Sequence, residues 1–329
     1  MDVLKGKKVL FFAADLFGYQ IEIKHKMEEL GATVDYYDER PSNTFLTKAL
    51  IRTNRDLLKF RITRYYQNIN DQTCKKKYDY IFIIKGESVS TSILKMLRNS
   101  HPDAKVILYL WDSIKNNKNA LKNLVYFDKI LSFDKEDVKN HNFIFRPLFY
   151  IDAYKDIDIP EKYMYDALFV GTTHSDRYIF VKKIEKQLFH LNKTVFSYFF
   201  FRSIFHYYQK KIFDYSFKDT SKENFHFAPL VSDKLLQLIY VSFAMIDTQH
   251  PNQSGLTIRT IEAIGAKRKL ITTNQNISLY DFYDPANILI VDRNNPIVTE
   301  EFLVSPYKNI DKSIYDKYSI TSWLNDVFA

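Results

Sequence analysis

The chain has 329 residues, 46% of them hydrophobic, which is enough to fill the cores of two domains. Its 47 lysines and arginines outnumber its 39 aspartates and glutamates, and the net charge of +8 favours anionic partners: nucleotides, nucleic acid or a phospholipid surface. The single cysteine, Cys74, excludes an internal disulfide and a cysteine-based zinc cluster, so a reducing cytoplasm is the simplest setting.

Short apolar runs alternate with helical patterns along the first half of the chain, which predicts an α/β fold with a parallel sheet. The first run is flanked by lysines, is short and ends in an acid, so we expect a first strand rather than a signal peptide. No apolar run is long enough to predict a transmembrane helix. We expect strands at 8–14, 33–38, 80–85, 106–111 and 129–134, and helices near 19–30, 44–69, 90–99 and 117–124.

A segment with two prolines, residues 145–162, interrupts this pattern and predicts an interdomain linker. The pattern then restarts. We expect strands at 166–171, 194–200, 225–230, 243–247, 269–273 and 288–292, and helices near 175–190, 203–213, 232–240, 256–265 and 313–328.

These elements predict an α/β protein with two Rossmann-like domains that face each other across a cleft. The N-terminal domain would span 1–150 and the C-terminal domain 163–312, with a C-terminal helix, 313–329, that could pack back on the first domain. One long doubly wound sheet is the alternative, and the proline-bearing linker counts against it.

Acids follow most of the predicted strands of the first half. Ligands of open parallel sheets gather at the carboxyl ends of the strands, although acids there also cap the next helix. The acids at these ends are Asp15, Asp38, Glu87, Asp112 and Asp134. Glu87 stands out because Gly86 beside it allows a tight backbone approach, and we take Glu87, then Asp112 and Asp15, as candidates for a general base.

The segment FVGTTHSDR places a glycine and two hydroxyls between a predicted strand and a helix. Backbone amides near Gly171 and Thr172 could meet a diphosphate, with His174 and Arg177 in the first turn of the helix. An ordinary connection capped by Ser175 is the alternative. The glycine-rich Walker and dinucleotide fingerprints are absent, which argues against a P-loop NTPase or an NAD enzyme.

Residues 243–274 form the most informative stretch, a strand, loop, helix and second strand. The loop carries Gly255, and the helix carries Arg259 and Glu262. A helix N-terminus that faces a loop can hold an anionic group, and a carboxylate two turns into the helix can bind a ribose hydroxyl. Together these features indicate a site for a nucleoside diphosphate.

QSGLTIRTIEAIGAKRKLITTN resembles the donor-binding segment of GT-B glycosyltransferases. With IIKGESVS, LYLWDS, FDKILSFD and FVGTTHSDR, it is similar to bacterial enzymes of capsule, lipopolysaccharide and exopolysaccharide synthesis. The resemblance implies transfer of a sugar from a nucleotide-sugar donor to a surface-polysaccharide or lipid-linked acceptor, without a metal or other cofactor. It implies that Glu262 binds the ribose and that Gly255 and the amides after it lie near the diphosphate or sugar.

The sequence departs from the family at one position. Many retaining GT-B enzymes carry a second glutamate eight residues before the ribose glutamate, where this chain has Ser254. Gln253 and Asp247 are the alternatives for that sugar contact, and the stereochemical course stays open. The full donor set is Gly171, Thr172, His174, Arg177, Gln253, Ser254, Gly255, Leu256, Thr257, Arg259 and Glu262.

Charge on the leaving diphosphate would be stabilised by Arg177, Arg259 and Lys267. A structural ion pair between Arg259 and Glu262, three residues apart on a helix, is the alternative for that arginine. The base of the donor would lie near the loop 226–230, with Phe227 in the core as the alternative.

Two segments, 45–69 and 198–213, mix basic residues with apolar and aromatic ones. Either could lie on an anionic membrane from the cytoplasmic side, or could be a charged surface over an ordinary core stripe. For 198–213 the core stripe is the favoured interpretation. Two other functions stay open: a nucleotide-binding but non-catalytic partner in polysaccharide assembly, and a nucleic-acid-binding protein, for which no helix-turn-helix, RNP or zinc signature is present.

Overall fold

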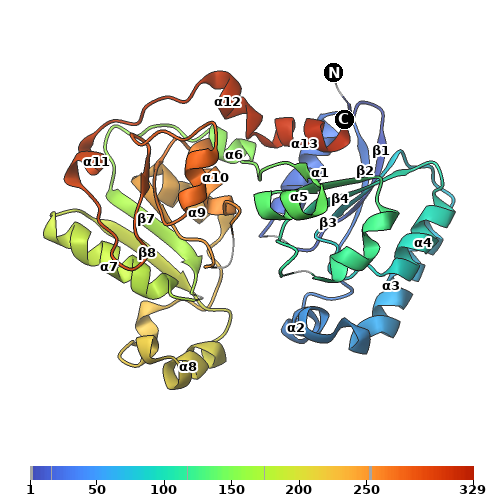
Figure 1. Ribbon diagram of the computed structural model, residues 1–329, viewed down its shortest axis with the longest axis horizontal. Helices are drawn as coiled ribbons and strands as arrows, with labels where there is room; N and C mark the ends of the chain where they lie inside the picture. Colours follow the sequence, from blue (N-terminus) through green and yellow to red (C-terminus); the bar gives the residue numbers. More distant parts are fainter. Residues whose placement is uncertain (1–2, 16, 117, 174, 252–253) are drawn as a thin grey trace. The chain divides into compact units, whose positions relative to one another are not determined.

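We analysed a computed structural model, which describes residues 3–15, 17–116, 118–173, 175–251 and 254–329. The chain divides into two compact units (Figure 1). Unit 1 comprises Met1–Leu148 and Ile320–Ala329, and unit 2 comprises Phe149–Ser319. The boundary between them lies within 145–162, the segment predicted as a linker.

Unit 1 contains a parallel sheet of six strands in the order β2-β1-β3-β4-β5-β6. Its central strands read as continuous apolar runs, such as YIFII in β3, because both faces of the sheet are covered. The strands are β1 (Lys8–Phe12), β2 (Thr33–Tyr37), β3 (Tyr80–Ile84), β4 (Lys105–Leu110), β5 (Lys129–Ser132) and β6 (Ile144–Phe145).

The described helices of unit 1 are α1 (Tyr19–Glu29), α2 (Phe45–Asn54), the 3-10 helix η1 (Arg55–Leu58), α3 (Lys59–Thr73), α4 (Thr91–Ser100), the 3-10 helix η2 (Lys118–Tyr126), α5 (Lys135–His141) and α13 (Ile320–Phe328). The prediction of one helix over 44–69 is wrong, because Asn54 leaves the helical conformation (φ −149°, ψ 83°). The helix predicted at 117–124 forms 3-10 turns, in which the Asn123 side chain donates to the carbonyl of Val89 (2.8 Å).

The predicted helix 313–328 is divided between the two units. The Tyr318 carbonyl accepts the amide of Tyr150 (2.9 Å), and a bridge between Tyr150 and Ser319 interrupts the helical ladder there. The last part, α13, packs on the sheet of unit 1: Trp323 is fully buried with its ring 4.8 Å from that of Tyr109, and Phe328 lies 5.2 Å from Phe82.

Unit 2 contains a parallel sheet of five strands in the order β11-β10-β9-β7-β8. The strands are β7 (Tyr165–Thr172), β8 (Val195–Phe200), β9 (Ser242–Asp247), β10 (Lys269–Thr272) and β11 (Ile288–Ile290). The strand predicted at 225–230 is reduced to one bridge, between Phe200 and His226. A 3-10 turn comes directly before it, and Pro229 has no amide hydrogen to extend the pairing.

The described helices of unit 2 are α6 (Asp152–Lys155), α7 (Arg177–His190), α8 (Ile204–Phe213), α9 (Ser232–Tyr240), α10 (Ile258–Gly265), α11 (Glu300–Val304) and α12 (Lys312–Lys317), with 3-10 turns η3 (Tyr215–Phe217), η4 (Lys222–Asn224) and η5 (Gln275–Leu279). Helices α7 and α8 pack buried aromatic and aliphatic side chains into one core with β7 and β8. Across the described parts of both units, no helix is both long and apolar enough to cross a membrane.

Candidate functional site

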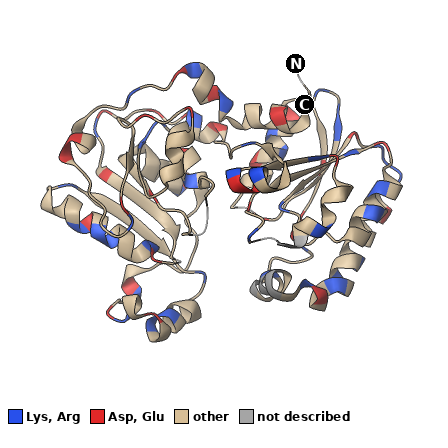
Figure 2. Cartoon of the chain, viewed as in Figure 1, with Lys and Arg blue, Asp and Glu red and all other residues tan. Residues whose placement is uncertain are grey.

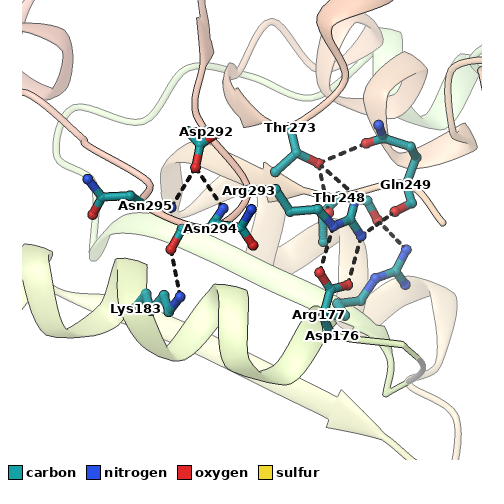
Figure 3. A network of polar contacts seen from close by, with 10 residues as sticks. All are labelled: Asp176, Arg177, Lys183, Thr248, Gln249, Thr273, Asp292, Arg293, Asn294 and Asn295. Atoms are coloured by element: carbon teal, nitrogen blue, oxygen red, sulfur yellow. Dashed lines mark hydrogen bonds and ion pairs between the residues drawn. The ribbon is translucent and has the colours of Figure 1, made fainter. Parts of the chain in front are cut away.

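The loops that follow β7, β9, β10 and β11 meet in a polar network at the carboxyl edge of the unit 2 sheet (Figure 3). Arg293, after β11, forms a bidentate ion pair with Asp176 at the start of α7 (2.7 and 2.8 Å). The same guanidinium donates to the carbonyl of Gln249 after β9 (2.8 Å). Arg293 therefore connects three loops, and sequence reasoning missed it because it lies just beyond the acid that ends the last predicted strand.

Short-range hydrogen bonds hold the turn that carries Arg293. Asp292 accepts the backbone amides of Asn294 (2.8 Å) and Asn295 (2.7 Å), as acids in such turns commonly do. Lys183 from α7 donates to the carbonyl of Asn294 (2.6 Å). These contacts fix the direction in which Arg293 leaves the sheet (Figure 3).

Arg177, the first residue of α7, points into the same network. Its guanidinium donates to the carbonyls of Thr248 (2.5 Å) and Thr172 (3.3 Å). The Nε of Arg177 and the hydroxyl of Thr173 are buried and have no hydrogen-bond partner among the described residues. Buried donors are nearly always satisfied, so these two mark a place where a ligand or water oxygen would be stabilised.

The cationic character of this edge is reflected in the pKa of Arg177. Burial lowers the pKa of its guanidinium, the carboxylate of Asp247 opposes that effect, and the charges of Arg259 and Arg293 lower it further. Arg259 and Arg293 therefore lie close enough to act on Arg177, and each of them is also paired with a carboxylate, Arg259 with Glu262 and Arg293 with Asp176.

Gly171 makes room for this arrangement. A Cβ atom there would lie 2.9 Å from Cζ of Phe169 and 3.2 Å from Nη1 of Arg177. Both distances are shorter than ordinary van der Waals contacts. A glycine at position 171 therefore lets the side chain of Arg177 lie against β7. The predicted residues Gly171 and Thr172 are the last two of that strand.

Asp247 anchors the start of α10. It is 4% exposed, and its Oδ2 accepts hydrogen bonds from the hydroxyls of Thr257 (2.5 Å) and Thr260 (2.8 Å). Thr257 is the N-cap residue and accepts the amide of Thr260 (3.2 Å). Asp247 was an alternative for the missing sugar contact, and the structure shows that this carboxylate holds the cap of α10.

Glu262 lies one turn into α10, not two, because the helix begins at Ile258. The side chain is buried, accepts a hydrogen bond from the hydroxyl of Tyr154 (2.9 Å) and forms an ion pair with Arg259. The alternative of a structural Arg259–Glu262 pair therefore describes the contact that is present. Tyr154, in α6, was not anticipated because nothing in its local sequence links it to α10.

Two asparagine side chains that follow β10 bind the loop before α10. Asn274 donates to the carbonyls of Ser254 and Gly255 (3.4 Å each), and Asn276 donates to that of Ser254 (3.2 Å). Gly255 and Leu256 are buried. His174 and Gln253, two further residues of the predicted donor set, lie outside the described residues.

Lys267 does not join this group, which corrects the prediction that it helps to stabilise the diphosphate. It lies in the turn between α10 and β10, at the opposite end of the helix from Thr257. Its ammonium lies 5.4 Å from the ring centre of Tyr315. Phe227 packs against the core of unit 2, the alternative that was left open for the 226–230 loop.

A second cluster of charges lies at the carboxyl edge of the unit 1 sheet. Glu87 is 7% exposed and forms ion pairs with Arg40 (2.6 Å) and Lys85 (3.2 Å). Lys85 lies 3.7 Å from the carboxylate of Asp112. Lys85 (φ 75°) and Gly86 (φ 67°) both have a positive φ, so the backbone turns sharply there. The turn brings the side chains of Lys85 and Glu87 together.

Glu39, which sequence reasoning missed, is fully buried in this cluster. Its Oε1 accepts the amide of Ser88 (2.8 Å), and its Oε2 has no partner among the described residues. Burial, with the nearby Glu87 carboxylate adding to it, raises the pKa of Glu39 to about 8.

The remaining acids at this edge have different surroundings. Asp15 is exposed and lies 3.5 Å from the side-chain amide of Gln20. Asp134 is the N-cap of α5 and so has the capping role that was the alternative to function, whereas Asp38 accepts the amide of Arg40 (2.7 Å) in the loop before α2, whose N-cap is Thr44. Among residues that the structure describes, no group of three or more His, Cys, Asp or Glu side chains is placed to hold a metal ion.

Two parallel α/β units of this kind define the two-domain, Rossmann-like GT-B fold, and the comparisons with solved structures confirm that prediction. No family model and no curated protein sequence matches the chain. Anabaena Alr3699/HepE in complex with UDP and glucose is similar with a TM-score of 0.57 and 8% identity, over 98% of this chain and 98% of that chain.

Two further structures show how far the likeness extends. A glycosyltransferase from Rickettsia africae ESF-5 has a TM-score of 0.56 and 14% identity, over 97% of this chain and 96% of that one. UDP-GlcNAc 2-epimerase from Neisseria meningitidis, bound to UDP-GlcNAc, has a TM-score of 0.50 and 11% identity, over 97% and 98%. At such identities the likeness shows the fold alone, and an epimerase shares it.

Proposed function

We propose that the protein is a glycosyltransferase that moves a sugar from a nucleotide-sugar donor to an acceptor hydroxyl. One observation carries the proposal: the carboxyl edge of the unit 2 sheet combines a capped helix N-terminus, a buried carboxylate in α10 and a group of guanidiniums with an unsatisfied donor. This is the edge at which open parallel sheets bind ligands. Proteins of similar fold have been solved in complex with UDP and glucose and with UDP-GlcNAc.

The diphosphate, the ribose and the sugar of the donor would each meet a complementary group in unit 2. The diphosphate would accept hydrogen bonds from Arg177, from Arg293 and from the first amides of α10, which the helix dipole favours. The ribose hydroxyls would donate to Glu262, which already binds the hydroxyl of Tyr154. The sugar would meet the loop around Ser254 and Gly255.

In the transfer, the acceptor oxygen forms a bond to the anomeric carbon, and the bond from that carbon to the diphosphate oxygen breaks. The nucleoside diphosphate leaves with the electron pair, and guanidiniums stabilise its charge. In an inverting reaction, a carboxylate of unit 1 takes the proton of the acceptor hydroxyl. Glu87, which is paired with Arg40 and Lys85, is the first candidate for this base, followed by Asp112 and Asp15.

We propose further that the acceptor belongs to a surface polysaccharide or a lipid-linked glycan, that no metal is required, and that the protein works at the cytoplasmic face of the membrane. In segment 45–69 the apolar stripe of Ile62, Tyr66 and Ile69 lies in the core, as the alternative interpretation had it. Leu57 (69% exposed) and Phe60 (80% exposed) lie outside that core, beside exposed lysine and arginine side chains. These two apolar side chains would contact the membrane surface.

A thermal-shift screen against nucleotides and nucleotide sugars tests donor binding, because a ligand of the folded state raises the melting temperature by mass action. A hit is then incubated with and without glycan acceptors, with EDTA in one arm, and the products are separated by chromatography. Acceptor-dependent release of nucleoside diphosphate that survives EDTA supports the proposal.

Other outcomes assign other functions. Conversion of the donor to its epimer without an acceptor would indicate an epimerase. Binding without turnover across the donor and acceptor panels would indicate the non-catalytic partner, and stabilisation by oligonucleotides alone would indicate a nucleic-acid-binding protein. A Glu262→Ala variant that is folded and keeps full affinity for the nucleotide sugar would overturn the donor-site assignment.

A further inference from the structure

Helix α8 is apolar on two faces, and only one of them is covered by unit 2. On the inner face Tyr207 is 1% exposed, packs against Phe201 and Phe225, and donates its hydroxyl to the carbonyl of Thr220 (2.9 Å). On the outer side Phe205 is 82% exposed and Ile212 is 75% exposed. One apolar face of α8 therefore packs in the core of unit 2, whereas the apolar side chains on the other side are exposed.

Three of the exposed side chains share one side of α8. Phe205, Tyr208 and Ile212 are three and four residues apart, so they lie on one side of the helix. Phe213, the last residue of α8 (82% exposed), and Tyr215 in the 3-10 turn after it (86% exposed) are exposed as well. Large exposed apolar patches of this kind mark sites of interaction in water-soluble domains. We call these five residues the α8 surface.

The residues around the α8 surface are mainly basic. Arg202, Lys210, Lys211 and Lys218 stand in the segment 202–218 against one acid, Asp214, which gives 4 − 1 = +3. In Figure 2 part of the ribbon of α8 is blue, the colour of lysine and arginine. Two copies of the surface brought together would therefore place like charges against each other, which disfavours self-association.

We propose that the α8 surface docks on an anionic phospholipid membrane. Exposed aromatic and aliphatic side chains on a helix fit the boundary between head groups and acyl chains, and the exposed side chains of Arg202 and Lys218 beside them would reach the lipid phosphates. This role does not depend on the proposed glycosyl transfer, and it places a membrane contact on unit 2 in addition to the one considered for 45–69.

The test uses the single exposed cysteine of the chain. In a Cys74→Ser background, Phe213→Cys is labelled with an environment-sensitive fluorophore and titrated with vesicles of phosphatidylglycerol and phosphatidylcholine. Phe189→Cys is the matched control, since Phe189 is also an exposed phenylalanine of unit 2 (76%), on α7. We expect a blue shift at position 213 and none at 189, and we expect it to weaken with phosphatidylcholine alone or at high salt.

A second measurement uses the unlabelled chain. Phe205→Ser/Ile212→Ser should reduce co-sedimentation with the anionic vesicles about tenfold or more, whereas Phe189→Ser should not. Because these side chains are exposed, both variants should melt at the temperature of the parent. Unchanged sedimentation of the double variant would overturn the proposal, and so would equal shifts at 213 and 189. A dimer that forms without lipid and is lost in the double variant would assign the surface to a second copy instead.

Discussion

The buried carboxyl group of Glu39 makes the stability of unit 1 depend on pH in a direction that can be calculated. Burial raises its pKa from the ordinary 4.5 to about 8 in the folded chain. Between these values the folded state keeps a proton that the unfolded state releases, so the free energy of unfolding falls as the pH rises. The full effect corresponds to about 5 kcal/mol, at about 1.4 kcal/mol per pH unit, as an upper bound.

The perturbation is Glu39→Gln, which keeps an oxygen for the amide of Ser88 and cannot ionise. The free energy of unfolding of Glu39→Gln, relative to that of the parent, should rise by roughly 2 to 3 kcal/mol between pH 6 and pH 8. The chain has two tryptophans, Trp111 and Trp323, and both belong to unit 1. Tryptophan fluorescence during urea denaturation therefore follows this unit alone.

Glu22→Gln is the matched control, since Glu22 is an exposed glutamate of the same unit. Its stability relative to the parent should change little with pH. If the difference between Glu39→Gln and the parent stayed constant from pH 6 to pH 8, the carboxyl would not be buried as the structure has it, and the reasoning would be refuted.

Three further substitutions test unit 2. Gly265→Ala should lower its stability by about 1 to 3 kcal/mol in calorimetry, because a Cβ there would lie 2.5 Å from Cγ of Tyr150; an unchanged melting temperature would contradict that packing. Arg268→Lys should cost about 2 to 4 kcal/mol, because its buried guanidinium donates to four backbone carbonyls and an ammonium cannot reach them all; tolerance of lysine would argue against this network. Asp176→Asn should weaken nucleoside diphosphate binding about tenfold in titration calorimetry by loosening Arg293, with little effect on melting; equal affinity would remove this ion pair from the site.

The sequence predicted the layout of the fold well because apolar runs and helical periodicity report burial directly. Strands β3 and β9 lie where they were expected, and α9 spans the predicted residues. The errors occurred where backbone contacts from distant parts of the chain decide the conformation. The helix predicted at 313–328 breaks because Tyr150 binds the carbonyl of Tyr318, a contact that no local pattern reveals.

The same limit applies to the site. Helix α10 could be predicted from its local pattern, but its start was placed at 256, before the cap residue Thr257, so Glu262 was expected one turn too deep in the helix. Arg293 and Tyr154 could not be predicted, since each reaches the site across many residues of chain. Lys267 was misplaced because proximity in sequence to α10 was taken for proximity to its N-terminus.

Titration calorimetry of a nucleoside diphosphate tests the central claim most directly. The parent should bind, and Arg177→Gln and Glu262→Gln should each lose affinity at least about tenfold, because each removes a charge-assisted hydrogen bond to the ligand. Arg61→Gln, an exposed arginine of unit 1, should bind like the parent. Equal affinity in folded Arg177→Gln, Glu262→Gln and parent proteins, or no binding by the parent to any nucleoside diphosphate, would contradict a donor site at the carboxyl edge of the unit 2 sheet.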